Sequence, residues 1–280
     1  MAIILGVDVG GSTTKIVAFD KEIIGTLQVK ANDQMTSLFG AIGNLLYQHR
    51  LKLEEIEKII LTGVGASLIK KDIYGIPTFQ VNEFEAIGYG GLMLSGLSEA
   101  LVVSMGTGTA FVQASKDQIT HIGGSGVGGG TLLGLSSKLL GESDIEAVIA
   151  CAQAGDLSHV DLSISEISNT KIPTLPATAT ASNFGKIKST ATGGDLALGL
   201  INMVFQTAGV LSAFCCTGRG IRDIVVTGSM ATLPQAQEML DAVGSLYGLH
   251  FLIPEDAIFA TAIGAATLHH YREQNAKNQK

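Results

Sequence analysis

The sequence predicts an α/β protein built from two copies of one small domain, with a ligand-binding cleft between the copies. The 280 residues are 46% hydrophobic and 15% charged, which is enough core material for one large domain or two of ordinary size. A strand–glycine turn–strand pattern occurs twice, 96 positions apart, and a strand ending in Thr-Gly occurs at residues 58–63 and again at 223–228. We therefore expect an N-terminal domain at residues 1–98 and a C-terminal domain at residues 99–280.

The first copy begins with a glycine hairpin. The apolar run at residues 3–9 ends at Gly10-Gly11, where glycine permits a tight turn. A later segment has Leu38, Ile42 and Leu45 at helical spacing. In chain order, we expect strands at 3–9, 15–20, 21–28 and 57–61, and helices at 34–50 and from Ala66 onward.

The second copy repeats the hairpin, with expected strands at 102–105 and 110–114, a helix at 132–140 and a strand at 223–226. Residues 196–218 carry no formal charge and approach the length of a membrane span. Because they include Asn202, Gln206 and Thr207, they favour a helix buried inside the protein, and we expect no membrane association.

Charge and cysteine content exclude several functions. Lys and Arg number 18 against 25 Asp and Glu, which gives a net charge of −7, so a nucleic-acid partner is not expected. Cys151, Cys215 and Cys216 lack the spacing of a disulfide framework or a zinc site. This pattern is typical of a reducing compartment, and the N-terminal segment lacks the basic start of a signal peptide. We therefore expect a cytoplasmic protein.

The turn of the first hairpin has the chemistry of a phosphate-binding loop. Glycines let the backbone approach a ligand, and exposed amides can point at phosphate oxygens. At the end of the strand, the Asp8 carboxylate can hold Mg²⁺, which takes oxygen ligands. A plain glycine hairpin with a capping aspartate is the alternative, although it would not require the hydroxyl groups. The nucleotide-binding candidates are Asp8, Val9, Gly10, Gly11, Ser12, Thr13, Thr14 and Lys15.

Two further glycine tracts follow. The turn at residues 106–109 again offers amides and hydroxyls, including Thr107, so a nucleotide can be held from both sides. The tract at 123–131 opens the expected helix, and free amides at a helix N-terminus bind anions. Its GxGxxG spacing does not follow a buried apolar strand, which disfavours a dinucleotide fold, and the chain has no GxxxxGK[ST] loop.

Glu83 lies at the expected start of a helix, where an acid stabilises the helix by itself. It can instead act as a general base that takes the proton from a hydroxyl group attacking a phosphoryl group. The residues alone leave both interpretations open, and they do not distinguish Glu83 from Glu85.

The paired hairpins resemble the phosphate loops of the actin-like ATPase and sugar-kinase superfamily. More narrowly, nearly the whole chain resembles the type II pantothenate kinases. The more specific matches are the tract at 123–135 and the Ala-Ser-Asn-Phe-Gly run at 181–185. Other matching segments lie at 6–15, 62–66, 82–84, 106–108, 226–229 and 259–265.

The resemblance implies two actin-like, RNase H-like α/β domains around a nucleotide cleft. It implies ATP-dependent phosphorylation of pantothenate to 4'-phosphopantothenate, the first step of coenzyme A biosynthesis, with Mg²⁺ and in a homodimer. It makes Glu83 the catalytic base, Asp8 the magnesium contact and Thr107 a substrate contact. It assigns ATP binding to residues 8–15 and to Gly128, Gly129, Gly130, Thr131 and Ser229.

His121 departs from this pattern. The family places an arginine here to hold the pantothenate carboxylate, and a neutral imidazole cannot form such a bidentate, charged clamp. His121 is therefore the candidate substrate contact, and a kinase acting on pantetheine or an amino sugar stays open as an alternative.

Two other functions compete. ATPase activators of 2-hydroxyacyl-CoA dehydratases begin with a similar Gly-Ser-Thr-Thr-Lys run, but they need cysteines to hold an iron–sulfur cluster. The helical, apolar surroundings of the three cysteines predict ordinary core thiols instead. A nucleotide-binding regulator without turnover is the other alternative, and Glu83 argues against it.

Overall fold

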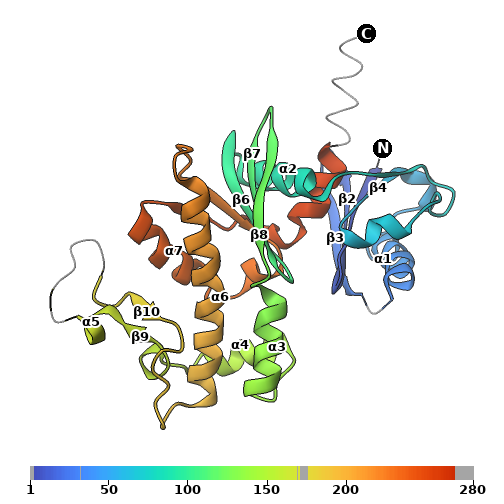
Figure 1. Cartoon of the computed structure of the whole chain (residues 1–280). Helices are drawn as coiled ribbons and strands as arrows, with labels where there is room; N and C mark the ends of the chain where they lie inside the picture. Colours follow the sequence, from blue (N-terminus) through green and yellow to red (C-terminus); the bar gives the residue numbers. More distant parts are fainter. Residues whose placement is uncertain (1–2, 32, 169, 171–175, 269–280) are drawn as a thin grey trace.

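The computed structural model describes residues 3–31, 33–168, 170 and 176–268, and it shows an α/β protein with two five-stranded mixed sheets (Figure 1). The strands are β1 (Ile3–Val9), β2 (Thr13–Asp20), β3 (Glu22–Lys30), β4 (Ile56–Thr62), β5 (Thr78–Gln80), β6 (Glu99–Met105), β7 (Thr109–Ser115), β8 (Ile119–Ser125), β9 (Leu162–Ser163), β10 (Thr180–Ser182), β11 (Asp223–Thr227) and β12 (His250–Leu252).

The α-helices are α1 (Gln34–Gln48), α2 (Glu83–Ser95), α3 (Gly129–Leu139), α4 (Ile145–Ala152), α5 (Ile164–Ile167), α6 (Gly193–Cys216) and α7 (Ala236–Tyr247). A further helix covers residues 260–268. Short 3₁₀ helices are η1 (Leu53–Glu55), η2 (Val64–Leu68), η3 (Leu157–His159), η4 (Ser229–Thr232) and η5 (Ala257–Phe259).

The two sheets repeat one topology, which confirms the predicted duplication. Their strand orders are β3-β2-β1-β4-β5 and, in reverse, β12-β11-β6-β7-β8. In each sheet three strands form an antiparallel meander, and two further strands run parallel to its first strand. The register also matches, because Asp8 pairs with Thr62 in one sheet and Ser104 pairs with Thr227 in the other. The second copy differs by a long insertion between β8 and β11, which contains α3 to α6.

Two helices lie between the sheets. The helix at 260–268 packs on Ile4, Val17 and Ile60 of the first sheet, whereas α2 packs mainly on β6, β7 and β8 of the second. They cross at glycines, since a Cβ atom at Gly90 or Gly264 would overlap backbone of the other helix. The boundary between residues 98 and 99 stays a proposal: it separates the two sheets, while α2 and the helix at 260–268 each pack across it.

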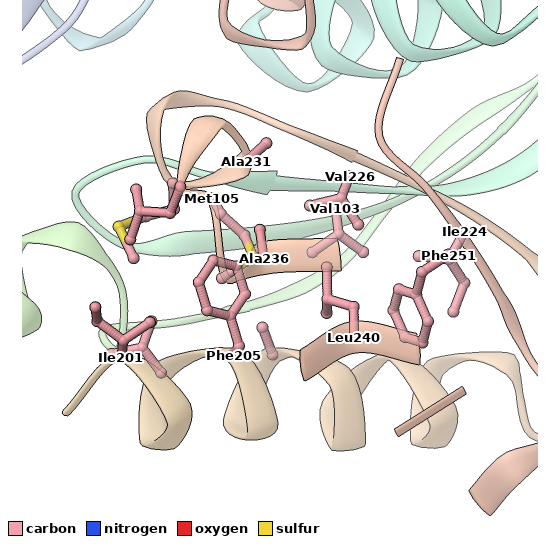
Figure 2. Close-up of a cluster of buried hydrophobic side chains, with 14 of the residues drawn as sticks. Val103, Met105, Ile201, Phe205, Ile224, Val226, Ala231, Ala236, Leu240 and Phe251 are labelled. Atoms are coloured by element: carbon pink, nitrogen blue, oxygen red, sulfur yellow. The ribbon is translucent and has the colours of Figure 1, made fainter. Parts of the chain in front are cut away.

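The outer face of the second sheet is covered by α6. Figure 2 shows Ile201 and Phe205 of α6 directed toward the strands that carry Val103 and Met105, and all four side chains are buried. By length and composition α6 could cross a membrane, but 61% of its most apolar window is buried inside the protein. The predicted buried helix is confirmed, and α6 serves as the core of the second copy.

Two local predictions differ from the structure. The helix expected from Ala66 is only the 3₁₀ turn η2, because Gly63 and Gly65 pack so closely against Val9 that the chain bends around the end of β1. The helix expected at 132–140 begins earlier, at Gly129, while Gly123 and Gly124 belong to β8 and pair with β7. The glycine tract therefore divides between the end of a strand and the start of a helix.

Candidate active site

Asp8 and Lys15 lie opposite each other at the start of the first hairpin. They form a register pair between β1 and β2, and Lys15 Nζ is 3.9 Å from Asp8 Oδ2. Both side chains are nearly buried, and the turn beyond them is closed by the Gly10 N–H donating to Thr13 O at 3.1 Å. The hairpin thus holds one carboxylate and one ammonium group at the point where β1 ends and β2 begins.

The Asp8 carboxyl group is poised to take up a cation. Burial raises its pKa to about 6, the neighbouring Lys15 ammonium opposes the rise, and the charge of Glu83 adds to it. A buried carboxylate with one incompletely compensating cation gains free energy from a second cation, and Mg²⁺ takes carboxylate oxygen together with water and phosphate oxygens. Asp8 therefore fits the predicted magnesium contact.

Glu83 begins α2, and its charge is coupled to those of Asp8 and Lys15. The Asn82 side chain caps the helix by accepting the Phe84 and Glu85 N–H groups at 2.9 and 3.2 Å, which fixes Glu83 in the first turn. Burial raises the pKa of Glu83, and the Lys15 ammonium lowers it. This coupling makes Glu83 a candidate acid of the site, and the choice of Glu83 over Glu85 stays a prediction.

The second glycine turn meets the first. Ser12 Oγ and Thr107 Oγ1 lie 3.2 Å apart, within hydrogen-bonding distance, and both residues are exposed. The Gly106 N–H donates to Gly108 O at 2.9 Å and shapes the second turn. A residue predicted to bind ATP and a residue predicted to contact the acceptor are therefore neighbours.

The start of α3 is joined to the second turn. The Gly129 N–H donates to Gly106 O at 2.8 Å, and the Gly130 N–H donates to Thr107 O at 2.9 Å. A Cβ atom at Gly128 would lie 2.7 Å from Thr107 O, so only glycine allows this approach. The prediction of free amides at this helix start is therefore wrong for Gly129 and Gly130, because both amides hold the turn in place. Thr131 closes the motif by accepting the Gly128 N–H and donating to Gly126 O.

Ser229 follows Gly228, the glycine of the second Thr-Gly, to which sequence reasoning assigned no role in the site. Gly228 has φ +90°, and a Cβ atom there would lie 2.5 Å from Met105 O. In the first copy Gly63 has φ +86°, and its Cβ would lie 2.5 Å from Asp8 Oδ1. These two glycines let η4 and η2 approach the ends of β6 and β1, and the repeated Thr-Gly was the signal that could have identified them.

His121 lies on β8 and stacks on Phe84, the residue after Glu83. The ring centroids are 3.7 Å apart and the rings are inclined by 9°. His121 is exposed, whereas Phe84 is half-buried. This stack brings His121 beside the start of α2, and it gives Phe84 a contact that its place in the matching segment at 82–84 did not reveal.

The cysteines lie apart from this site. Cys151 in α4 is exposed, which corrects the expectation of a buried thiol, while Cys216 at the end of α6 is buried. Burial raises the pKa of the Cys216 thiol to about 11, so its thiolate is disfavoured. Within the described residues, no group of three or more His, Cys, Asp or Glu side chains could hold a metal ion.

Comparisons with known proteins identify the family of the chain. The sequence profile of the Fumble family matches residues 97–247. A type II pantothenate kinase of Bacillus cereus (strain G9842) is 26% identical over 271 residues, covering 93% of this chain and 96% of that protein. A type II pantothenate kinase of Oceanobacillus iheyensis is 28% identical over 236 residues, covering 81% and 84%.

Solved structures show the same fold. An activator of the 2-hydroxyisocaproyl-CoA dehydratase from Clostridium difficile, with bound ADPNP, aligns with a TM-score of 0.72 at 15% identity and covers 99% of this chain and 98% of that chain. An ROK hexokinase from Thermus thermophilus aligns with a TM-score of 0.55 at 16% identity, covering 95% and 97%. The fold is that of the actin-like ATPases and sugar kinases, and the chain belongs to the Fumble family, the family of the type II pantothenate kinases.

Proposed function

We propose that this enzyme transfers the γ-phosphoryl group of ATP to the primary hydroxyl group of pantothenate, giving 4'-phosphopantothenate and ADP. The observation that carries the proposal is the convergence of Asp8, Lys15 and Glu83 in one electrostatic cluster beside the joined glycine turns. The names of the relatives, which match over most of both chains, support pantothenate as the acceptor.

The phosphate groups of ATP fit the two glycine turns. Backbone amides of the first turn, Lys15, the Ser12 hydroxyl and Ser229 would contact ATP. Asp8 would hold Mg²⁺, which neutralises charge on the phosphates when bound. The hydrogen bonds from the Gly129 and Gly130 amides join the second turn to α3 and restrain Thr107. The second turn is therefore positioned before the ligand binds.

Glu83 would act as the general base. Its carboxylate accepts the proton of the acceptor hydroxyl, the hydroxyl oxygen forms a bond to the γ-phosphorus, and the bond from that phosphorus to the bridging oxygen breaks with ADP as the leaving group. Partial burial raises the pKa of Glu83 and makes its carboxylate a better base, while the Lys15 ammonium opposes that rise. Asn82 supports the reaction by fixing the first turn of α2.

Thr107 and His121 are the proposed acceptor contacts. The stack on Phe84 holds the His121 ring flat beside the start of α2, where the family pattern has a guanidinium group. An acceptor bound there meets an aromatic surface with one polar edge instead of a permanent charge. This observation favours a second candidate, a kinase that prefers an uncharged acceptor such as pantetheine or an amino sugar.

The dehydratase-activator alternative is less well supported. The likeness to the Clostridium difficile activator is one of fold, at 15% identity. Cys151 packs near Gly193 at the start of α6, whereas Cys215 and Cys216 lie at the end of that 24-residue helix, roughly 30 Å away at 1.5 Å per residue. The homodimer and the cytoplasmic location remain parts of our proposal.

An ADP-release assay across pantothenate, pantetheine and glucosamine tests the function. We expect ATP-dependent turnover with pantothenate at the highest kcat/KM, and a product whose mass equals that of pantothenate plus one phosphoryl group. Turnover with pantetheine or glucosamine alone would show that pantothenate is not the acceptor. ATP hydrolysis without any phosphorylated acceptor would contradict the proposed kinase activity.

A further inference from the structure

A surface hollow of about 540 Å³ lies at the edge of the first sheet, and none of its residues belongs to the site described above. We refer to it as the edge hollow, and it is lined by Ile69, Lys70, Lys71, Asp72, Thr78 and Gln80. One wall is β5, the edge strand of the first sheet, and the other is the segment that follows η2.

Two exposed lysines border the edge hollow, together with the single carboxylate of Asp72. Lys70 and Lys71 are exposed, and within the described part of the chain no ion pair or hydrogen bond engages either ammonium group. The nearby Asp72 accepts the Thr78 N–H at 3.1 Å, which commits one of its carboxylate oxygens to the turn between them. Adjacent unpaired lysines in a protein of net charge −7 form a local positive patch.

The other polar groups of the edge hollow are already bonded. The Thr78 hydroxyl donates to Ile76 O at 2.9 Å and accepts the Ile73 N–H at 3.1 Å. The Gln80 side-chain amide donates to both Ala66 O and Ile69 O at 2.9 Å. These bonds hold the side chains of both walls, and the two lysine ammonium groups remain as charged donors for a ligand.

We propose that the edge hollow is a second binding site, separate from the cleft, for the phosphate group of a small phosphorylated compound. A lysine ammonium binds phosphate as a compact point charge, and two of them match a dianion. The volume lies within the usual range for small-molecule sites. The ligand is held by local charge, since the protein as a whole repels anions.

The edge hollow is connected to Asp8 and Glu83 of the candidate active site through hydrogen bonds and short chain segments. Gln80 ties the end of η2 to β5, and η2 begins directly after Gly63, which packs against Asp8. From β5 the chain runs within three residues to Glu83. An anion that bridges Lys70 and Lys71 would fix the segment after η2, so η2 would open less often.

Hydrogen exchange of the full chain tests this proposal, with inorganic pyrophosphate as the probe in metal-free buffer at constant ionic strength. We expect slower exchange in peptides covering residues 64–72. The Lys70→Gln/Lys71→Gln variant should need at least about tenfold more pyrophosphate for the same protection, because two charge-assisted contacts are lost. Peptides covering residues 8–15 report binding in the cleft separately, so failure of the edge hollow is distinguishable from failure of the proposed function.

The matched control is Lys116→Gln/Lys188→Gln, which removes the same charge at exposed positions elsewhere and should behave as the wild type. Inorganic phosphate, ADP and the phosphorylated acceptor, compared at equal concentration, identify the source of the phosphate group by the strongest protection. Unchanged exchange at 64–72 with all four compounds would overturn the proposal. Equal protection in the Lys70→Gln/Lys71→Gln variant would overturn it as well.

Discussion

The hydroxyl oxygens of Ser12 and Thr107 lie 3.2 Å apart, although 95 positions separate the two residues in the chain. Each residue belongs to the glycine turn of one copy of the duplicated unit, so this contact joins the copies at their loops. The copies are not chemically equivalent, because the position of Asp8 in β1 is occupied by Ser104 in β6. Each copy supplies a hydroxyl group, the first copy adds the Asp8 carboxylate, and the second adds the hydrogen bonds that join its turn to α3.

The Ser12–Thr107 contact predicts coupled effects on catalysis. Ser12→Ala and Thr107→Ala should each lower kcat/KM by roughly 3- to 10-fold, since a neutral hydrogen bond contributes about 0.5–1.5 kcal/mol. The double variant should lose less than the product of the two single losses, because either change breaks the same bond. Losses that simply multiply would show that the two hydroxyls act independently, and Thr107→Ser should keep most of the activity.

The raised pKa of Asp8 predicts that this residue lowers the stability of the ligand-free protein while it supports catalysis. Its pKa is about 6 in the folded protein and near 3.9 in an unfolded chain, so the folded state binds the proton more tightly. The free energy of unfolding of the ligand-free protein should therefore fall as pH rises from about 4 to 6, by up to about 3 kcal/mol from this group. Asp8→Asn should stabilise the ligand-free protein at pH 7 by about 1–3 kcal/mol while weakening Mg²⁺-dependent turnover.

Urea unfolding at pH 7 and at pH 4 checks the Asp8 prediction. The stabilisation by Asp8→Asn should shrink at pH 4, where the wild-type carboxyl group is already protonated. Equal stabilisation at both pH values would show that ionisation of Asp8 does not cause the stability difference. Normal turnover of Asp8→Asn at limiting Mg²⁺ would make Asp8 only a turn residue.

The duplication and most strands were predictable, because apolar runs that end at glycine leave a periodic signal in the sequence. The start of α2 was also predictable in outline, since Glu83 follows a capping asparagine. The hydrogen bonds of the Gly129 and Gly130 amides could not be predicted, because their acceptors lie on a turn more than twenty residues away. The Phe84–His121 stack is likewise a long-range contact between a helix and an edge strand, and local spacing carries no information on it.

His121→Arg tests acceptor recognition. A guanidinium group can pair with the pantothenate carboxylate in two parallel hydrogen bonds and can still stack on Phe84. KM for pantothenate should fall roughly tenfold or more, the scale of a charged hydrogen bond, while KM for pantetheine should not change. A parallel fall for both acceptors would point to altered folding of the site instead of carboxylate recognition.

Gly228→Ala tests the close approach of η4 to β6. The added Cβ would lie 2.5 Å from Met105 O at a positive φ, so we expect a loss of stability of about 2–3 kcal/mol and impaired ATP binding. Gly96→Ala is the matched control, because Gly96 also has positive φ (+70°) but open space around its Cβ position. It should cost about 1 kcal/mol and leave ATP binding intact, and equal costs for both variants would contradict the packing argument.

Glu83→Gln provides the most direct test that the joined loops form a phosphoryl-transfer site. We predict that kcat for pantothenate falls by roughly 10²–10⁴, the usual contribution of a general base, while the affinity for Mg²⁺ and a non-hydrolysable ATP analogue stays within about twofold. Glu85→Gln, two positions away in the same helix turn, should keep nearly full turnover. Wild-type kcat in Glu83→Gln, or an equal loss in Glu85→Gln, would contradict the assignment of Glu83 as the base.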